Sequence, residues 1–289
     1  MKTAIALGTF DGLHEGHRAV LEKTLPFYSI AVTFKLPPKA VITGKPQLLI
    51  LPQERKKRLC DFGINQVVMQ DFDDVRNIDA LDYLKNLRDK YHPSLIACGF
   101  NYRFGKNALG DSGLLQKFCN DNNIEFCCVP PQCDGDKVIS STVIRDYIKN
   151  GNVKKASSLL YGGFGFMSTV LHGDARGRTI GFPTANQAYP ELLVKPKFGV
   201  YISKVTVDGN EYKAITNIGL RPTFKTEKIG CETYIKGLSK DLYGKEVKIE
   251  LLDFVREEKK FDSIEQLETA IKKDVNLLEE WRNLNDLEN

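Results

Sequence analysis

The chain has 289 residues, enough for two domains that each bury a core. Hydrophobic residues make up 42% and charged residues 27%, which is typical of a globular protein and excludes a disordered or fibrous one. The net charge of +4 is spread along the chain, so it suits phosphate-bearing metabolites and argues against nucleic acid, which requires a denser basic patch. No apolar stretch approaches the length of a membrane-spanning helix, so we expect no membrane partner.

The seven cysteines form no C-x-x-C pair, and their number is odd. This favours free thiols in a reducing compartment over disulfide bonds or a metal site. A strand-like run follows Met1 and Lys2 directly, where a secretory signal peptide would place a longer apolar stretch. We therefore expect a cytoplasmic protein, and nothing in the sequence predicts its oligomeric state.

The first half of the chain, up to about residue 150, alternates short apolar strands with amphipathic helices. This alternation predicts an α/β domain with a parallel, doubly wound sheet. Ligands of such sheets bind beyond the carboxyl ends of the strands, so functional residues should lie just after each strand. The expected strands cover residues 3–7, 29–34, 66–69, 94–98 and 125–129, and the expected helices cover 17–25, 53–61, 80–91 and 113–122.

A glycine- and histidine-containing segment follows the first strand and opens the first helix. Gly8 and Gly12 remove side chains where the backbone must turn sharply and approach a ligand. His14 and His17 lie three residues apart, so both imidazoles should point the same way at a helix N-terminus that attracts phosphate. The pattern predicts a cradle that stabilises a transferring nucleotidyl group. The alternatives are a chance pair of loop histidines and a zinc pair, whose spacing differs from H-E-x-x-H.

A second helix start places the hydroxyls of Ser141 and Thr142 near Arg145 on the first turn. Hydroxyl and N–H groups can hold phosphate oxygens, and a guanidinium suits a triphosphate. The alternative is an ordinary cap, with Ser141 or Thr142 beginning a short helix. Another helix over residues 153–160 leads to a Gly-Gly turn, so we expect one domain over 1–160 and a second over 161–289.

The second half has short strand-like runs separated by turn residues, which predicts an antiparallel barrel. Asp208-Gly209, between two of these runs, is a strong hairpin signal. Ser263 and Gln266 form a capping box that opens a final helix of about 25 residues. The expected strands cover residues 166–171, 200–207, 212–217, 231–236 and 247–252.

A glycine-rich loop after the first of these strands is the second candidate site. Gly173, Gly177 and Gly181 would let the backbone wrap phosphates. Thr184 offers a hydroxyl and Asn186 an amide oxygen, which are hard ligands suited to Mg²⁺. The alternative is a structural loop, although such a loop rarely ends in P-T-A-N.

The N-terminal motifs resemble the H-x-G-H and I-S-S-T-x-I-R signatures of the nucleotidylyltransferase superfamily, which has a Rossmann-like fold. The longer match, G-x-F-D-G-x-H-x-G-H over residues 8–17, resembles the FMN adenylyltransferase module of prokaryotic FAD synthetases. Residues 99–105 are similar to the flavin-side motif of that family, and an aromatic-rich loop suits an isoalloxazine ring. The resemblance implies catalytic roles for His14, His17 and Arg145, ATP or phosphate contacts for Gly8, Phe10, Asp11, Ser141 and Thr142, and flavin contacts for Asn101, Tyr102 and Phe104.

The sequence departs from this family after the second strand. Family members commonly carry a T-F-x-P-H-P-like segment, whereas residues 33–38 read Thr-Phe-Lys-Leu-Pro-Pro and lack the histidine. If this segment touches ATP or FMN, adenylyl transfer should be slower or differently tuned.

The second half resembles riboflavin kinase over residues 173–186, and again at 198–201, 216–224, 241–244 and 256–261. The resemblance implies a six-stranded antiparallel barrel with a terminal helix. It implies that Glu232 is the general base for the ribityl 5′-hydroxyl and that Thr184 and Asn186 hold the magnesium of Mg·ATP. It also implies phosphate contacts for Gly173, Gly177, Arg178 and Gly181. Without the resemblance, Glu232 would be taken as a solvated strand residue.

Together the motifs indicate a bifunctional riboflavin kinase and FMN adenylyltransferase that makes FMN and then FAD. Its implied substrates are riboflavin, FMN and ATP, with Mg²⁺ and no tightly bound organic cofactor. One alternative keeps the kinase and treats the N-terminal domain as a nucleotide-binding regulatory module. Another is a non-enzymatic flavin-binding regulator, against which two independent phosphate cradles argue.

Overall fold

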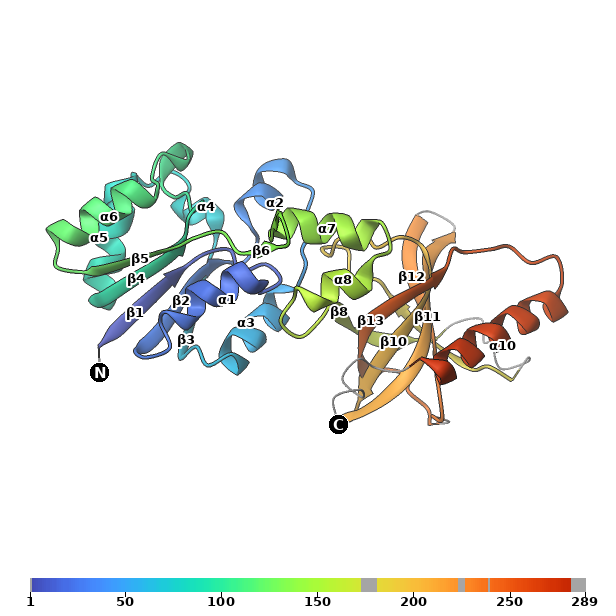
Figure 1. The fold of residues 1–289 in the computed structure, drawn as a ribbon. Coiled ribbons are helices and arrows are strands. Elements are labelled where there is room, and N and C mark those ends of the chain that lie inside the picture. Colours follow the sequence, from blue (N-terminus) through green and yellow to red (C-terminus); the bar gives the residue numbers. More distant parts are fainter. Residues whose placement is uncertain (1, 173–180, 223–226, 239, 282–289) are drawn as a thin grey trace. The chain divides into compact units, whose positions relative to one another are not determined.

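The computed structural model describes residues 2–172, 181–222, 227–238 and 240–281 (Figure 1). The chain divides into two compact units, which we treat separately. The first unit comprises residues 1–145, 159–162 and 192–194, and the second comprises 146–158, 163–191 and 195–289. Within the described residues no helix is long and apolar enough to cross a membrane. The seven cysteines are free.

The first unit is built on a five-stranded parallel sheet with the strand order β3-β2-β1-β4-β5. This confirms the predicted doubly wound sheet, and the predicted strands agree with the observed ones to within a residue at each end. The strands are β1 (Thr3–Leu7), β2 (Tyr28–Phe34), β3 (Gln66–Gln70), β4 (Pro93–Gly99) and β5 (Glu125–Val129). The main helices are α1 (Glu15–Glu22), α3 (Pro52–Asp61), α5 (Ala80–Tyr91) and α6 (Ser112–Asp121).

Several short elements were not predicted, because they are too brief to show a periodic pattern. They are α2 (Pro38–Thr43), α4 (Phe72–Val75), a 3₁₀ turn at Lys106–Ala108 and a small hairpin of β6 (Cys133–Asp134) and β7 (Lys137–Val138).

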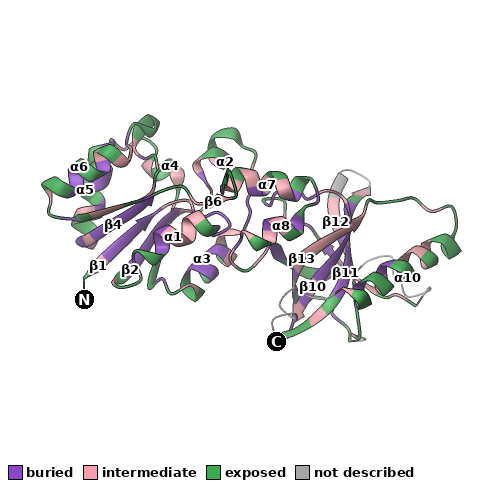
Figure 2. Ribbon diagram, viewed as in Figure 1, coloured by how far each residue is buried: buried purple, intermediate pink, exposed green. Residues whose placement is uncertain are grey.

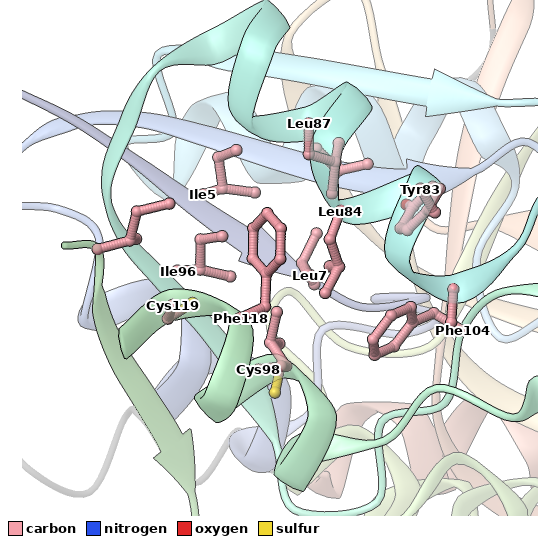
Figure 3. Packing of buried hydrophobic residues seen from close by; sticks show 14 of the residues in the cluster. Ile5, Leu7, Tyr83, Leu84, Leu87, Ile96, Cys98, Phe104, Phe118 and Cys119 are labelled. Carbon is pink, nitrogen blue, oxygen red and sulfur yellow. The ribbon is translucent and has the colours of Figure 1, made fainter. Parts of the chain in front are cut away.

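The central strands of the sheet are buried (Figure 2), and the two faces of the sheet bury different residues of the same strand. Ile5 and Leu7 of β1 belong to a core formed with α5 and α6, which Figure 3 shows from close by. Ala6, between them, points to the other face and packs against residues of α1 and α3. Side chains of a strand alternate between faces, so β1 supplies large residues to one core and an alanine to the other.

One helix cap differs from the prediction. The helix α7 (Ser141–Lys149) is capped by Ser140, whose hydroxyl accepts a hydrogen bond from the Val143 N–H at 3.3 Å. The expected cap was Ser141 or Thr142, and Ser141 instead donates its hydroxyl to the Asp11 carbonyl at 3.1 Å. The prediction was wrong by one residue because three consecutive hydroxyl residues offer equivalent caps. A short helix, α8 (Val153–Ser158), follows.

The second unit is a closed antiparallel barrel with the strand order β10-β11-β12-β9-β8-β13. This confirms the six-stranded barrel, although the strand-like runs in the sequence predicted only five of its strands. The missed strand is β9, whose sequence Thr-Ala-Asn-Gln-Ala lacks apolar alternation. The strands are β8 (Gly165–Leu171), β9 (Thr184–Ala188), β10 (Gly199–Val207), β11 (Asn210–Pro222), β12 (Glu227–Ile235) and β13 (Glu246–Arg256).

The barrel interior contains a row of hydrogen-bonded polar side chains. The Ser203 hydroxyl lies 2.7 Å from that of Thr216, which lies 3.1 Å from that of Thr233. Thr233 in turn donates to the Gln187 side-chain oxygen at 3.4 Å. All four residues are buried, and they come from four neighbouring strands. Because buried polar groups are costly unless paired, this row stabilises one register among the four strands.

The C-terminal helix α10 (Ile264–Glu280) is attached to the barrel by an apolar contact and an ion pair. Ser263 caps it as predicted, accepting a hydrogen bond from the Gln266 N–H, but the helix is 17 residues long rather than about 25. Leu278 packs with apolar residues of β10 and β11. The Arg256 guanidinium donates to both carboxylate oxygens of Asp274, at 3.1 and 2.7 Å.

We expect the substitution Asp274→Ala to loosen α10 from the barrel. Asp274 is only 4% exposed, so its loss leaves the Arg256 guanidinium partly buried without its carboxylate, at a cost of about 3 kcal/mol. Chemical unfolding followed by circular dichroism measures the change. Glu268→Ala, which removes an exposed ion pair with Lys272 on the same helix, is the matched control and should cost under about 0.5 kcal/mol. Equal effects of the two substitutions would contradict this account.

Candidate active sites

The first unit contains a cavity of about 350 Å³ at the carboxyl ends of β1, β4 and β5. This is the edge at which parallel sheets bind ligands, and most of the residues predicted for the first site line it. The cavity is also lined by Pro130 and Gln132, which the sequence did not single out. The predicted residues that line the cavity are Gly8, Phe10, His14, His17, Asn101, Tyr102, Ser141 and Thr142.

His14 and His17 lie side by side at the start of α1, as their spacing predicts. Their rings are stacked, with centroids 3.7 Å apart and an interplanar angle of 20°. Burial lowers the pKa of His14 to about 4, helped by the nearby charge of Arg145. Burial also lowers the pKa of His17 well below its usual value, and His14 adds to the effect. Both imidazoles are therefore neutral at pH 7, and their buried Nδ1 atoms have no hydrogen-bond partner among the described residues.

The turn that carries these histidines has an unusual backbone. Phe10 and Leu13 have φ angles of 48° and 47°, in the left-handed region that non-glycine residues rarely adopt. Gly12 has a φ of 90°, and a Cβ there would lie 2.7 Å from a methyl of Leu160. Phe10 and Leu13 are completely buried, so core packing holds the strained backbone in place. The turn is therefore fixed before any ligand binds.

Asp11 and Arg145 lie beside this cavity without lining it. The Asp11 carboxylate accepts hydrogen bonds from the Leu49 and Ile50 N–H groups, at 2.9 and 3.3 Å, and forms an ion pair with Arg145. Burial raises the pKa of Asp11, and the guanidinium groups of Arg145 and Arg55 act against that rise. In this structure Asp11 ties the turn to residues 49 and 50 and to α7. The predicted contacts of Asp11 and Arg145 with ATP stay predictions.

Arg55 is a positioning residue that sequence reasoning missed. It belongs to α3 and is completely buried. Its guanidinium donates to the Thr9 carbonyl at 3.3 Å, to the Lys35 carbonyl at 2.9 Å and to the Phe34 carbonyl. It thereby joins the ends of β1 and β2 at the cavity rim. Its setting in the charged stretch Gln-Glu-Arg-Lys-Lys-Arg is typical of a solvated helix face, so no sequence signal marked it.

The flavin-side motif is divided between the cavity and the core. Asn101 and Tyr102 line the cavity, whereas Phe104 is only 6% exposed and packs with Tyr83 in the core beneath it (Figure 3). The segment that departs from the family pattern adjoins the cavity, because Phe34 and Pro38 line it. A change at residues 35–37 can therefore act directly on a bound ligand.

Among the described residues of the second unit, two cavities share one lining residue. One has a volume of about 540 Å³ and is lined by residues of β9 and β12, by Leu238 and by residues 240–243. The other has a volume of about 730 Å³ and is lined by Glu232, Arg221, Arg256 and residues 258–261 among others. Thr184 lines both cavities. Two ligands bound in these cavities would meet at Thr184.

Glu232 lies in the larger cavity within a row of polar side chains. In the barrel register it is opposite Asn186 on one neighbouring strand and Asn217 on the other. Directly opposed residues of adjacent strands point to the same face of a sheet, so the three side chains are neighbours. The Glu232 carboxylate is 3.0 Å from an Arg221 nitrogen, and its side chain is 39% exposed. The carboxylate is thus held in place while it remains open to the cavity.

The residues predicted to hold Mg²⁺ fit such an ion in their chemistry. Thr184 and Asn186 lie two residues apart on β9 and offer neutral hard oxygens beside the Glu232 carboxylate. Gly181 has a φ of 80° and open space where a Cβ would be, so the loop leading into β9 turns there. The other predicted phosphate-binding residues, Gly173, Gly177 and Arg178, lie outside the described residues.

Comparison with known proteins matches both halves of the chain. A riboflavin kinase family model matches residues 162–282, and an FAD synthetase family model matches residues 1–143. Bifunctional riboflavin kinase/FMN adenylyltransferases from Listeria monocytogenes and Escherichia coli are each 33% identical to this chain. The alignments cover 93% of this chain in both cases, with 89% of the Listeria protein and 90% of the Escherichia coli protein.

A solved structure has the same fold over nearly the whole chain. It is described as a macrolide-efflux protein from Streptococcus pneumoniae and matches with a TM-score of 0.88 and 31% identity. The match covers 97% of this chain and 95% of that protein.

We expect acid to destabilise the first unit through its two histidines. His14 has a pKa near 4 in the folded state and about 6.5 when unfolded, so only the unfolded state takes up its proton between these values. The neutral His14 side chain therefore contributes about 3 kcal/mol to the free energy of unfolding. This contribution is complete above pH 6.5 and is lost as the pH falls toward 4. Unfolding by urea across this range measures the slope, which His14→Gln should reduce. An unchanged slope in the variant would contradict the assignment.

Proposed function

The chain belongs to the family of bifunctional riboflavin kinase/FMN adenylyltransferases, and from that premise we propose which residues carry out each of its reactions. The protein uses ATP to phosphorylate riboflavin to FMN, and uses a second ATP to convert FMN to FAD with release of pyrophosphate. Both halves match their families, so the N-terminal half is more than a regulatory module. We assign adenylyl transfer to residues 1–160 and the kinase to residues 161–289.

One observation supports this assignment most directly. The motif residues of each half gather around a cavity in their own unit: the stacked histidines with the loop at Asn101 and Tyr102 in the first, and Glu232 with Thr184 in the second. Each reaction therefore has a separate set of side chains near which its substrates can bind.

Adenylyl transfer requires no proton transfer from the nucleophile. A phosphate oxygen of FMN attacks the α-phosphorus of ATP, the bond to the β-phosphate breaks, and pyrophosphate leaves. In this proposal, His14 and His17 stabilise the charge that develops on the α-phosphate oxygens. Ser141, Thr142 and the N-terminus of α1 bind the other phosphate oxygens. Asn101 and Tyr102 contact the flavin, and the strained turn at Phe10 keeps the histidines aligned.

Riboflavin phosphorylation does require a base. The ribityl 5′-oxygen attacks the γ-phosphorus of ATP, its proton passes to Glu232, and ADP leaves. Arg221 orients the Glu232 carboxylate toward the cavity. Thr184 and Asn186 would hold a magnesium ion, which supplies positive charge to the ATP phosphates when it is bound. The shared position of Thr184 supports this arrangement, because donor and acceptor must meet where the two cavities adjoin.

We expect the two activities to be separable by substitution. Glu232→Ala should lower conversion of riboflavin to FMN by about 100- to 10,000-fold, because the hydroxyl loses its base. The same variant, given FMN, should still make FAD at nearly the wild-type rate, because the phosphate nucleophile is already ionised. His14→Ala should lower FAD formation by about 10- to 1000-fold and let FMN accumulate. Chromatography of the flavin products measures both effects. Loss of both activities in a folded Glu232→Ala protein would contradict the two-site assignment.

We expect residues 36 and 37 to tune adenylyl transfer. Pro37 precedes α2 and lies between Phe34 and Pro38, both of which line the first cavity. The paired change Leu36→Pro and Pro37→His restores the family pattern and places an imidazole at the cavity rim, where it can donate to phosphate. FAD formation from FMN should rise severalfold, while the kinase rate, measured in the same preparation, should not change. A lower rate of FAD formation would show that this chain has adapted to its own segment.

A further inference from the structure

Asn217 has an unusual environment in the larger cavity of the barrel. It lies on β11 directly opposite Glu232 and lines the same cavity. Its side-chain nitrogen donates to the Glu258 carboxylate at 3.1 Å. Its side-chain oxygen is buried and has no hydrogen-bond partner among the described residues. A buried acceptor without a donor is costly, and in a cavity wall it points to a ligand that supplies the donor.

The contact with Glu258 determines which atom of the Asn217 side-chain amide has no hydrogen-bond partner among the described residues. A carboxylate can only accept hydrogen bonds, so the Asn217 nitrogen must face Glu258 and the oxygen must face away from it. The leftover oxygen can only accept, so the missing ligand atom is a hydroxyl or N–H donor. Asn217 is therefore oriented to receive a donor next to the position of the Glu232 carboxylate.

We propose that Asn217 accepts a hydrogen bond from the 4′-hydroxyl of riboflavin and that Glu258 positions it to do so. This inference rests on the proposed role of Glu232 toward the 5′-hydroxyl. Asn217 and Glu232 are cross-strand neighbours, and the 4′- and 5′-hydroxyls are neighbours on the ribityl chain. Asn217 is then a specificity-determining residue, because it distinguishes a ribityl chain from one that lacks this hydroxyl.

Gly219 makes the contact between Glu258 and Asn217 possible. A Cβ at this residue would lie 2.0 Å from a Glu258 carboxylate oxygen, so only glycine lets the carboxylate lie against β11. Its φ angle is not in the left-handed region, so alanine fits the backbone. Gly219→Ala should displace the flexible end of Glu258 while leaving both partners in the chain.

The experiment compares kcat/KM for phosphorylation of riboflavin, 4′-deoxyriboflavin and 2′-deoxyriboflavin. The wild type should disfavour the 4′-deoxy substrate by about 10-fold or more, because the Asn217 acceptor then stays unpaired in the complex. Asn217→Ala should bring the ratio of riboflavin to the 4′-deoxy substrate close to one and leave the ratio for the 2′-deoxy substrate unchanged. Gly219→Ala should lower the first ratio part of the way, and Glu258→Gln should retain it, because its amide oxygen can still accept from Asn217.

Three results would overturn the inference. The wild type could fail to discriminate against 4′-deoxyriboflavin, or Asn217→Ala could lower all three rates equally, as a merely structural residue would. Discrimination against N3-methylriboflavin that vanishes in Asn217→Ala would place the contact at the isoalloxazine ring instead. Absence of FMN formation by the wild type would contradict the proposed function itself, so the two failures are distinguishable.

Discussion

The first active site depends on the buried carboxylate of Asp11. The carboxylate accepts hydrogen bonds from the backbone N–H groups of residues 49 and 50 and forms an ion pair with Arg145. The backbone carbonyl of Asp11 accepts a hydrogen bond from the Ser141 hydroxyl. Burying an ion pair costs desolvation free energy, so this pair specifies the geometry of the site rather than adding to the stability of the fold. Three segments far apart in the sequence are held together by one residue. Arg55 does the same for the ends of β1 and β2.

In the barrel, the residues of the second candidate site are brought together by the pairing register of the strands. Glu232, Asn186 and Asn217 come together because β9, β11 and β12 pair in one register, and a slip of one residue would turn each side chain to the other face. The row of polar side chains inside the barrel, from Ser203 to Gln187, opposes such a slip, since its hydrogen bonds form in only one alignment. The strand β9, which carries Thr184 and Asn186, is thus held in register against β12 by the hydrogen bond between Thr233 and Gln187.

The sequence predicted the architecture, and most of the residues it predicted for the first site line the cavity there. It failed where the local pattern carries no signal. The parallel strands were predictable because buried strands show apolar runs bounded by turns. The strand β9 was not, because its residues serve the site and the polar interior instead of an apolar core. The cap of α7 was misplaced because Ser140 and Ser141 look alike in sequence, and only the Asp11 carbonyl distinguishes them. Arg55 was missed because a buried arginine within a charged helix resembles a solvated one until its partners are known.

The neutral, stacked histidines have a consequence for how the first candidate site would bind a polyphosphate. Polyphosphate placed beside two buried imidazoles favours their charged forms and raises their pKa values toward neutrality. Binding then draws protons from the solution, so affinity should increase as the solution becomes more acidic within the stable range. The heat of binding should also vary with the ionisation enthalpy of the buffer, since the buffer supplies those protons.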